Sequence, residues 1–259
     1  MDADILISLS AFGQAEVRRH GQLWFARLAH AAGADGVEVR GELLNHPESE
    51  VRAIAGAAAD SGLGVVYSSP EPLWNDDGGL HAAALERALV AAERLGAPRL
   101  KMSIGGYGAA SRDSFAALAT QRRGRAVELL IENDQTETAG TLPALRSFFA
   151  DAHEAGLTLP MTFDMGNWHW LGECPLRAAD ALGAQVGYVH CKGVQRERQR
   201  WIAVPLAESS APWRSVLHSL PADVPWAIEY PLAGDDLLDV TRTHVRQLRA
   251  LRAGFGAAA

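Results

Sequence analysis

Cysteine, lysine and long apolar runs are all scarce in this chain of 259 residues. Its two cysteines, Cys174 and Cys191, are too few for a framework of disulfides. Because the sequence has no stretch of about 18 consecutive apolar residues, we expect no membrane partner. The first ten residues lack the basic region that opens a signal peptide, so we expect a cytoplasmic protein.

Positive charge is also in short supply. Lys and Arg number 24 against 31 Asp and Glu, which gives a net charge of −7. Proteins that bind nucleic acid usually present a basic face that replaces counterions, so we expect no nucleic-acid partner. The segment after the first apolar run, Ser8–Gln14, also lacks the G-x-G-x-x-G fingerprint. That absence disfavours a dinucleotide-binding fold.

Short apolar segments alternate with longer segments rich in Ala, Leu and Arg. We predict eight strands at residues 5–10, 36–40, 64–69, 99–103, 127–133, 159–164, 186–192 and 226–230. We predict eight helices near residues 15–32, 48–61, 79–95, 113–125, 142–156, 175–183, 211–219 and 236–252. At this length the alternation predicts an α/β protein, a single (β/α)8 TIM barrel over residues 1–252, followed by a frayed C-terminal tail at 253–259. An open, doubly wound sheet is the alternative.

Four potential metal ligands stand near the ends of four predicted strands: Glu132, Asp164, His190 and Glu229. Each directly follows an apolar residue, so the alternation of a strand turns the apolar neighbour toward the helices and the polar residue toward the barrel interior. Three converging carboxylates repel one another unless a cation intervenes. We therefore predict one divalent metal ion. Oxygen and nitrogen ligands without a thiolate suit Mn²⁺, with Mg²⁺, Co²⁺ or Zn²⁺ as alternatives.

Other charged residues are predicted to reach the same end of the barrel. Lys101 and Lys192, the two lysines of an arginine-rich chain, both fall at predicted strand ends, which indicates ammonium groups that bind substrate. Glu38 and Arg40 from the second strand either pair with each other or bind substrate hydroxyls. The arginine-rich segment 195–200 favours an anionic substrate, with a solvated surface as the alternative.

The motifs Leu130–Asn133, Phe163–Asn167, Val189–Lys192 and Ile228–Tyr230 resemble those of the xylose-isomerase-like TIM-barrel superfamily. That superfamily contains sugar isomerases and epimerases, with the type 2 apurinic endonucleases as relatives. More narrowly, segments 132–136, 163–168 and 228–232 resemble the epimerase-like proteins of bacterial 2-ketogluconate utilisation. The resemblance implies that Glu132, Asp164, His190 and Glu229 bind one divalent metal and that the two glutamates also move protons.

The resemblance also implies substrate contacts. Arg196, six residues after His190, stands where the family carries a substrate-binding arginine. Asn167 stands where ketose epimerases often carry a substrate histidine and the endonucleases a zinc ligand, and His169 is a possible substitute. Because no histidine occurs between His190 and His218, the three-zinc site of the endonucleases cannot be assembled.

The predicted activity is a sugar isomerase or epimerase acting on a keto-sugar, a keto-sugar acid or a sugar phosphate. Glu132 or Glu229 would remove a proton beside a metal-polarised carbonyl and give an enediolate. Return of the proton epimerises or isomerises the sugar, and loss of a β-hydroxyl dehydrates it. A sugar or cyclitol dehydratase and a non-catalytic sugar-binding barrel are the alternatives. Barrels of this kind often pair, so a homodimer is one expected assembly.

Overall fold

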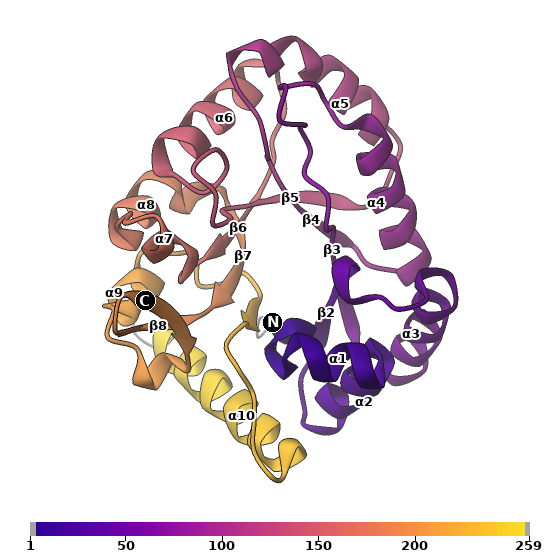
Figure 1. The fold of residues 1–259 in the computed structure, drawn as a ribbon, viewed down its shortest axis with the longest axis vertical. Helices are drawn as coiled ribbons and strands as arrows, with labels where there is room; N and C mark the ends of the chain where they lie inside the picture. Colours follow the sequence, from indigo (N-terminus) through magenta and orange to yellow (C-terminus); the bar gives the residue numbers. More distant parts are fainter. Residues whose placement is uncertain (1–3, 257–259) are drawn as a thin grey trace.

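A computed structural model describes residues 4–256 of the chain. Eight parallel strands close into a barrel in the order β1-β10-β7-β6-β5-β4-β3-β2, and helices surround it (Figure 1). The barrel strands are β1 (Ile5–Ser8), β2 (Gly36–Arg40), β3 (Gly64–Ser68), β4 (Arg99–Ser103), β5 (Glu128–Glu132), β6 (Met161–Asp164), β7 (Val186–Cys191) and β10 (Trp226–Ile228). The predicted (β/α)8 barrel is confirmed.

The helices follow the predicted order, but the structure adds the short helix α7 (Asn167–Trp170), divides one predicted helix and extends the last one. They are α1 (Gln14–His20), α2 (Gln22–Ala31), α3 (Pro47–Ser61), α4 (Ala82–Leu95), α5 (Phe115–Arg122), α6 (Leu142–Glu154), α7 (Asn167–Trp170), α8 (Pro175–Leu182), α9 (Trp213–His218) and α10 (Leu237–Gly256). The single helix predicted at 15–32 is divided at Gly21, whose φ of +78° is incompatible with a continuous helix. Helix α10 continues to Gly256, so residues 253–256 of the expected frayed tail are helical, and residues 257–259 lie outside the described residues.

Apolar strand residues form two separate clusters, one outside the barrel and one inside it. Alternate strand residues pack under the helices in the large outer core cluster. The inner cluster is small and consists of Leu6, Val66, Leu130, Tyr188 and Ala227. Because strand side chains alternate with period two, the next inward positions along these strands lie above this apolar floor. Those positions are polar, and their side chains line the barrel mouth above the apolar cluster.

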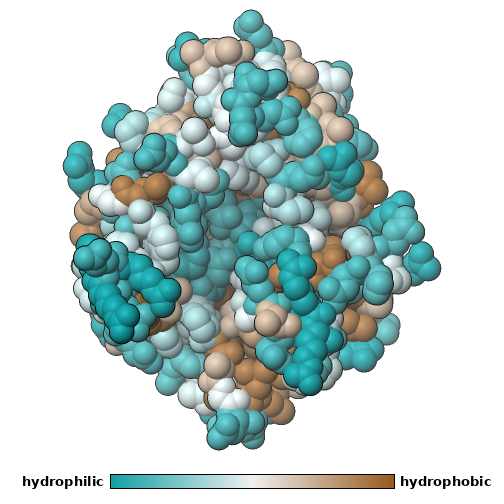
Figure 2. All heavy atoms as spheres, in the orientation of Figure 1, coloured by the Kyte–Doolittle hydropathy of each residue, from teal (hydrophilic) through white to brown (hydrophobic). Residues whose placement is uncertain are grey.

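A hairpin not predicted from the sequence follows β7. Strands β8 (Gly193–Glu197) and β9 (Arg200–Val204) pair antiparallel from Gly193↔Val204 to Glu197↔Arg200. The arginine-rich segment 195–200 therefore forms most of this hairpin. Figure 1 shows β8 beside α9 at the lower left, and Figure 2 shows strongly hydrophilic residues there.

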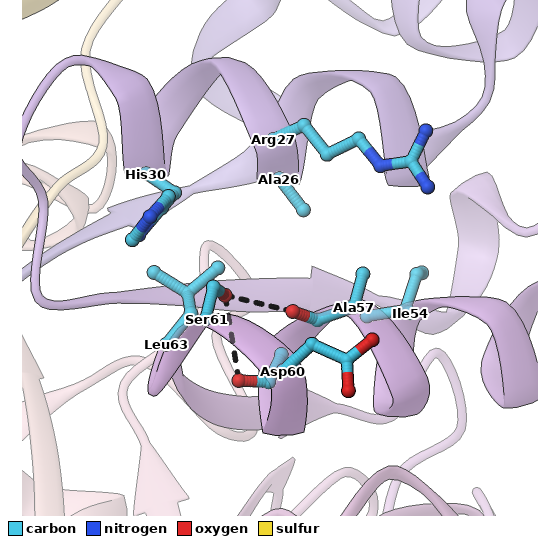
Figure 3. Close-up of a pocket in the computed structure, with 9 residues that line it drawn as sticks. Ala26, Arg27, His30, Ile54, Ala57, Asp60, Ser61 and Leu63 are labelled. Atoms are coloured by element: carbon cyan, nitrogen blue, oxygen red, sulfur yellow. Dashed lines mark hydrogen bonds between the residues drawn. The ribbon is translucent and has the colours of Figure 1, made fainter.

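The same face has a hydrophilic hollow over the barrel (Figure 2). A different hollow, of about 250 Å³, lies outside the barrel between α2 and α3 (Figure 3). Its lining includes Ala26 and His30 from α2, Ile54 from α3, and Leu63. Among residues 4–256, no helix is both long enough and apolar enough to cross a membrane.

Candidate metal centre and active site

The four predicted ligands meet at the barrel mouth. Glu132 and Asp164 end β5 and β6, His190 is the last residue but one of β7, and Glu229 directly follows β10. Potential ligand atoms of all four side chains lie within 4.8 Å of one another. Asp164 and His190 are fully buried, whereas the side chains of Glu132 and Glu229 are 14% and 9% exposed. The site is therefore open to solvent on the side of the two glutamates.

The apolar neighbours of these residues point the other way. Ile131, Phe163, Val189 and Ile228 all belong to the outer core cluster under the helices. In the register of the barrel, Asp164 lies opposite His190. Each strand turns its polar residue inward by alternation, and the parallel pairing places these residues side by side on neighbouring strands. The polar side chains therefore meet in one volume.

Two buried polar atoms of the cluster lack a hydrogen bond, which fits a site for a cation. His190 Nδ1 lies 2.8 Å from Glu229 Oε2, 3.2 Å from Glu132 Oε1 and 3.8 Å from Asp164 Oδ2. Neither Nδ1 nor Glu229 Oε2 makes a hydrogen bond of acceptable geometry within the described residues, although both atoms are buried. A buried nitrogen and oxygen with no hydrogen bond, beside two further carboxylates, form a donor set suited to Mn²⁺ or Mg²⁺.

Glu38 orients the histidine. Its Oε2 lies 2.7 Å from His190 Nε2, and both side chains are fully buried. Burial by itself raises the pKa of Glu38, but the charges of His190 and Lys101 outweigh burial and hold that pKa well below its ordinary value. Glu38 is therefore an ionised acceptor for Nε2–H, which leaves Nδ1 facing the other ligands. Burial lowers the pKa of His190, whereas Glu229 and Glu38 raise it well above its ordinary value, so a metal must displace a proton from Nδ1.

Arg40 and Lys101 hold the carboxylates in place. Arg40 Nη1 donates to Glu38 Oε1 at 3.0 Å and to Glu229 Oε1 at 2.9 Å. Glu38 and Arg40 thus pair with each other, and their contact with substrate hydroxyls stays a prediction. Lys101 Nζ donates to Glu132 Oε1 at 2.8 Å and lies 3.1 Å from Glu38 Oε1, and its side chain is 1% exposed. These cations keep Glu132 and Glu229 ionised and limit their rotation.

Lys192 reaches the cluster from just beyond β7. Its Nζ lies 2.6 Å from Asp164 Oδ2 and 2.9 Å from Glu229 Oε2. The side chain runs across Gly166, where an added Cβ would lie 2.6 Å from Lys192 Cδ. Burial lowers the pKa of Lys192, but the charges of Asp164 and Glu229 raise it by more, so the net pKa is above its ordinary value. The ammonium group therefore stays charged and shares two carboxylates with any bound metal.

Asn133 is a structural residue of the site that the sequence reasoning did not single out. It is fully buried, accepts from the Asp164 backbone N–H at 2.9 Å and donates to the Asp164 carbonyl at 3.0 Å. The Asn133 carbonyl accepts from Asn167 Nδ2 at 2.8 Å. Asn167 Oδ1 also lies 3.2 Å from Lys192 Nζ. The signal available in the sequence was an amide directly after Glu132. Predicted as a substrate contact, Asn167 here bonds to neighbouring protein groups.

Arg196 and His169 lie at the rim. Arg196 is exposed on β8, with its guanidinium carbon 5.6 Å from the centre of the Trp201 ring. The half-buried His169 ring lies 5.0 Å from the same tryptophan. Within the described residues, neither side chain contacts the four ligand residues. Their predicted role as substrate contacts therefore depends on a substrate long enough to reach the hairpin.

The fold and the site together define a TIM barrel with carboxylates and a histidine gathered at the carboxyl ends of its strands, where barrel active sites lie. The family model described as xylose isomerase-like TIM barrel matches residues 26–251. The chain therefore belongs to the xylose isomerase-like TIM barrel family. A comparison with curated protein sequences found no significant match.

Solved structures with this fold include the 3-keto-D-glucoside 4-epimerase from E. coli, which is 15% identical with a TM-score of 0.67 and covers 96% of this chain and 99% of its own. The probable 3-DHS dehydratase from Bacillus anthracis is 14% identical with a TM-score of 0.67, over 95% of this chain and 98% of its own. A xylose isomerase-like barrel protein from Mycobacterium smegmatis, in complex with magnesium, is 15% identical with a TM-score of 0.68, over 98% and 97%. At these identities the likeness shows the fold.

Proposed function

We propose that this protein is a divalent-metal-dependent isomerase or epimerase that acts on a keto-sugar, a keto-sugar acid or a sugar phosphate. The observation that carries the proposal is the convergence of Glu132, Asp164, His190 and Glu229, with one buried nitrogen and one buried oxygen that lack hydrogen bonds. A sugar epimerase among the proteins of similar fold supports the same reaction class. We propose Mn²⁺ as the preferred ion because the ligands mix carboxylate oxygen with one imidazole.

The four residues would hold the ion, which would act as a Lewis acid on the substrate carbonyl and make the adjacent C–H bond more acidic. Glu132 and Glu229 supply the proton transfers. Burial raises the pKa of Glu229, but His190 and Lys192 lower it well below its ordinary value, and Lys101 and His190 do the same for Glu132 to a smaller extent. Both side chains therefore start as bases, and the one that accepts the carbon-bound proton becomes the acid that can return it.

Deuterium exchange tests the proposal directly. The protein is loaded with Mn²⁺ and incubated in D₂O with a panel of ketoses, keto-sugar acids and their phosphate esters. We expect incorporation of deuterium at a carbon next to a carbonyl, loss of that exchange with EDTA, and its return on adding Mn²⁺. Glu229→Gln and Glu132→Gln should each reduce exchange at least about 100-fold while the circular dichroism spectrum stays unchanged.

Exchange that survives both substitutions would contradict the assigned proton transfers. A product lighter than the substrate by one water would indicate the dehydratase alternative. Binding of a sugar to the metal-loaded protein without any exchange would indicate a non-catalytic sugar-binding barrel.

A further inference from the structure

A cavity of about 270 Å³ opens beside Glu132, one of the four proposed metal ligands. Glu132, Lys101 and Arg40 form its inner end, and it extends over β3 and β4 to the loop after β5. One water takes up about 30 Å³ of the liquid, so the cavity has room for a chain of several hydroxylated carbons. A substrate whose carbonyl reaches Glu132 therefore has one end in this cavity.

Four of the five hydroxyl groups in the cavity wall have already donated their hydrogens to the protein. Ser103 Oγ and Thr136 Oγ1 each donate to a different oxygen of Asp134, both at 2.6 Å. Because Thr136 has only one hydroxyl hydrogen, the 3.3 Å contact between Thr136 and Thr138 must be donated by Thr138. Ser69 donates to a backbone oxygen at 3.1 Å. Ser69 and Ser103 each also accept from one backbone N–H, so each keeps one acceptor lone pair and no hydrogen to donate.

The carboxylates around the cavity likewise accept hydrogen bonds and cannot donate them. Glu71, Asp76 and Asp134 line it together with Glu132, and an ionised carboxylate can only accept hydrogen bonds. The two cations in the wall, Arg40 and Lys101, are already neutralised by carboxylates within 3.1 Å. The cavity therefore favours ligand groups that donate hydrogen bonds and carry no negative charge.

Two described side chains of the wall, Ser68 and Arg40, still have donor groups without a partner. Ser68 is 3% exposed and lines the cavity, and its hydroxyl has no hydrogen-bond partner within residues 4–256. In the sheet register Ser68 lies opposite Arg40. Arg40 uses Nε for Glu42 and Nη1 for Glu38 and Glu229, and Nη2 has no partner among the described residues. A nearly buried serine hydroxyl and one free amino group can each bind one oxygen of a neutral chain.

We infer that this cavity binds the polyhydroxyl chain of an unphosphorylated substrate and excludes a terminal phosphate ester. The inference rests on the proposed function and narrows its substrate class. Each sugar hydroxyl both donates and accepts, so it can use the acceptor-rich wall as well as Ser68. A phosphate dianion only accepts and would face Asp76 and Asp134 without a free cation to compensate, and such like-charge contacts act as strong discrimination.

The test compares matched pairs of probes on the Mn²⁺-loaded full chain: D-fructose with D-fructose 6-phosphate, and 2-keto-D-gluconate with its 6-phosphate. Dissociation constants come from calorimetry, and deuterium incorporation is followed in parallel. We expect the unphosphorylated member of at least one pair to bind at least about 100-fold more tightly than its phosphate. Ser68→Ala should weaken binding of that member about tenfold and leave the phosphate unchanged.

Two charge-reversing variants give a matched control. Asp76→Arg places a guanidinium at the cavity rim and should improve binding of the phosphate at least tenfold. Asp77→Arg makes the same change in net charge one residue away, where the side chain is exposed and does not line the cavity. It should leave the preference intact.

Binding separates this inference from the proposed reaction. If unphosphorylated sugars bind preferentially but exchange no deuterium, the proposed reaction is wrong and the cavity inference stands. If a phosphate binds as tightly as its partner, the inference is overturned even when exchange occurs. Failure of every probe to bind, or equal gains from Asp76→Arg and Asp77→Arg, also overturns it.

Discussion

Glu38→Gln isolates the contribution of a residue that touches a metal ligand without being one. Glutamine keeps the shape of the side chain, and its amide oxygen can still accept from His190 Nε2, but the charge is lost. Carboxylate partners of metal-bound histidines typically contribute 10- to 100-fold in metal affinity, or about 1.4–2.7 kcal/mol. Because Glu38 also helps to keep a proton on His190, its loss eases deprotonation. We therefore expect the smaller effect, a dissociation constant for Mn²⁺ that is about tenfold larger.

The assay is competition for Mn²⁺ with a chromophoric chelator at pH 7.5, together with thermal unfolding of the metal-free variant to check its folding. Glu42→Gln is the matched control: Glu42 pairs with Arg40 at 2.9 Å, as Glu38 does at 3.0 Å, but its side chain is 31% exposed and it is not among the contacts of His190. We expect Glu42→Gln to change Mn²⁺ affinity less than twofold. An unchanged affinity in Glu38→Gln, or an equal loss in Glu42→Gln, would refute orientation of His190 by Glu38.

Three further results are expected. Gly166→Ala should lower turnover at least tenfold with a nearly unchanged melting temperature, because the φ of −81° accepts alanine whereas the new Cβ displaces Lys192; normal turnover would remove Lys192 from the site chemistry. Asn133→Ala should lower the free energy of unfolding by about 2–4 kcal/mol in urea titrations, since two buried hydrogen bonds are lost; a change below about 1 kcal/mol would contradict this. Iodoacetamide at pH 8 should label exposed Cys174 in the native protein and Cys191 only after unfolding, because burial raises the pKa of Cys191 to about 12; labelling of both in the native state would contradict the structure.

Features of the site that depend on residues close in the sequence could be predicted, whereas contacts between residues far apart in the sequence could not. Strand alternation is a local rule, and it was enough to turn Glu132, Asp164, His190 and Glu229 toward one another once the eight units were counted. The partner of Glu38 is 152 positions away in the sequence, and only closure of the barrel brings the two together. The choice between pairing and substrate binding for Arg40 likewise depends on distances that a sequence pattern does not contain.

Two of the features that the sequence did not predict have local causes. Segment 195–200 consists of charged and amide residues, which strands disfavour, and it becomes a strand pair only because β8 and β9 supply hydrogen bonds to each other. Gly21 lies inside a continuous helical pattern of apolar residues, and periodicity alone does not reveal the left-handed backbone that divides α1 from α2.

The hairpin after β7 has a consequence for how such a protein can acquire new specificities. Its first and last residues, Gly193 and Val204, are paired neighbours, so both ends of the excursion meet at one point of the barrel. Exchange of the segment between them alters the rim while the strand register that sets the metal ligands stays in place. Under the proposed function, contacts between the hairpin and a substrate can therefore change by selection or by design without rebuilding the cluster of Glu132, Asp164, His190 and Glu229.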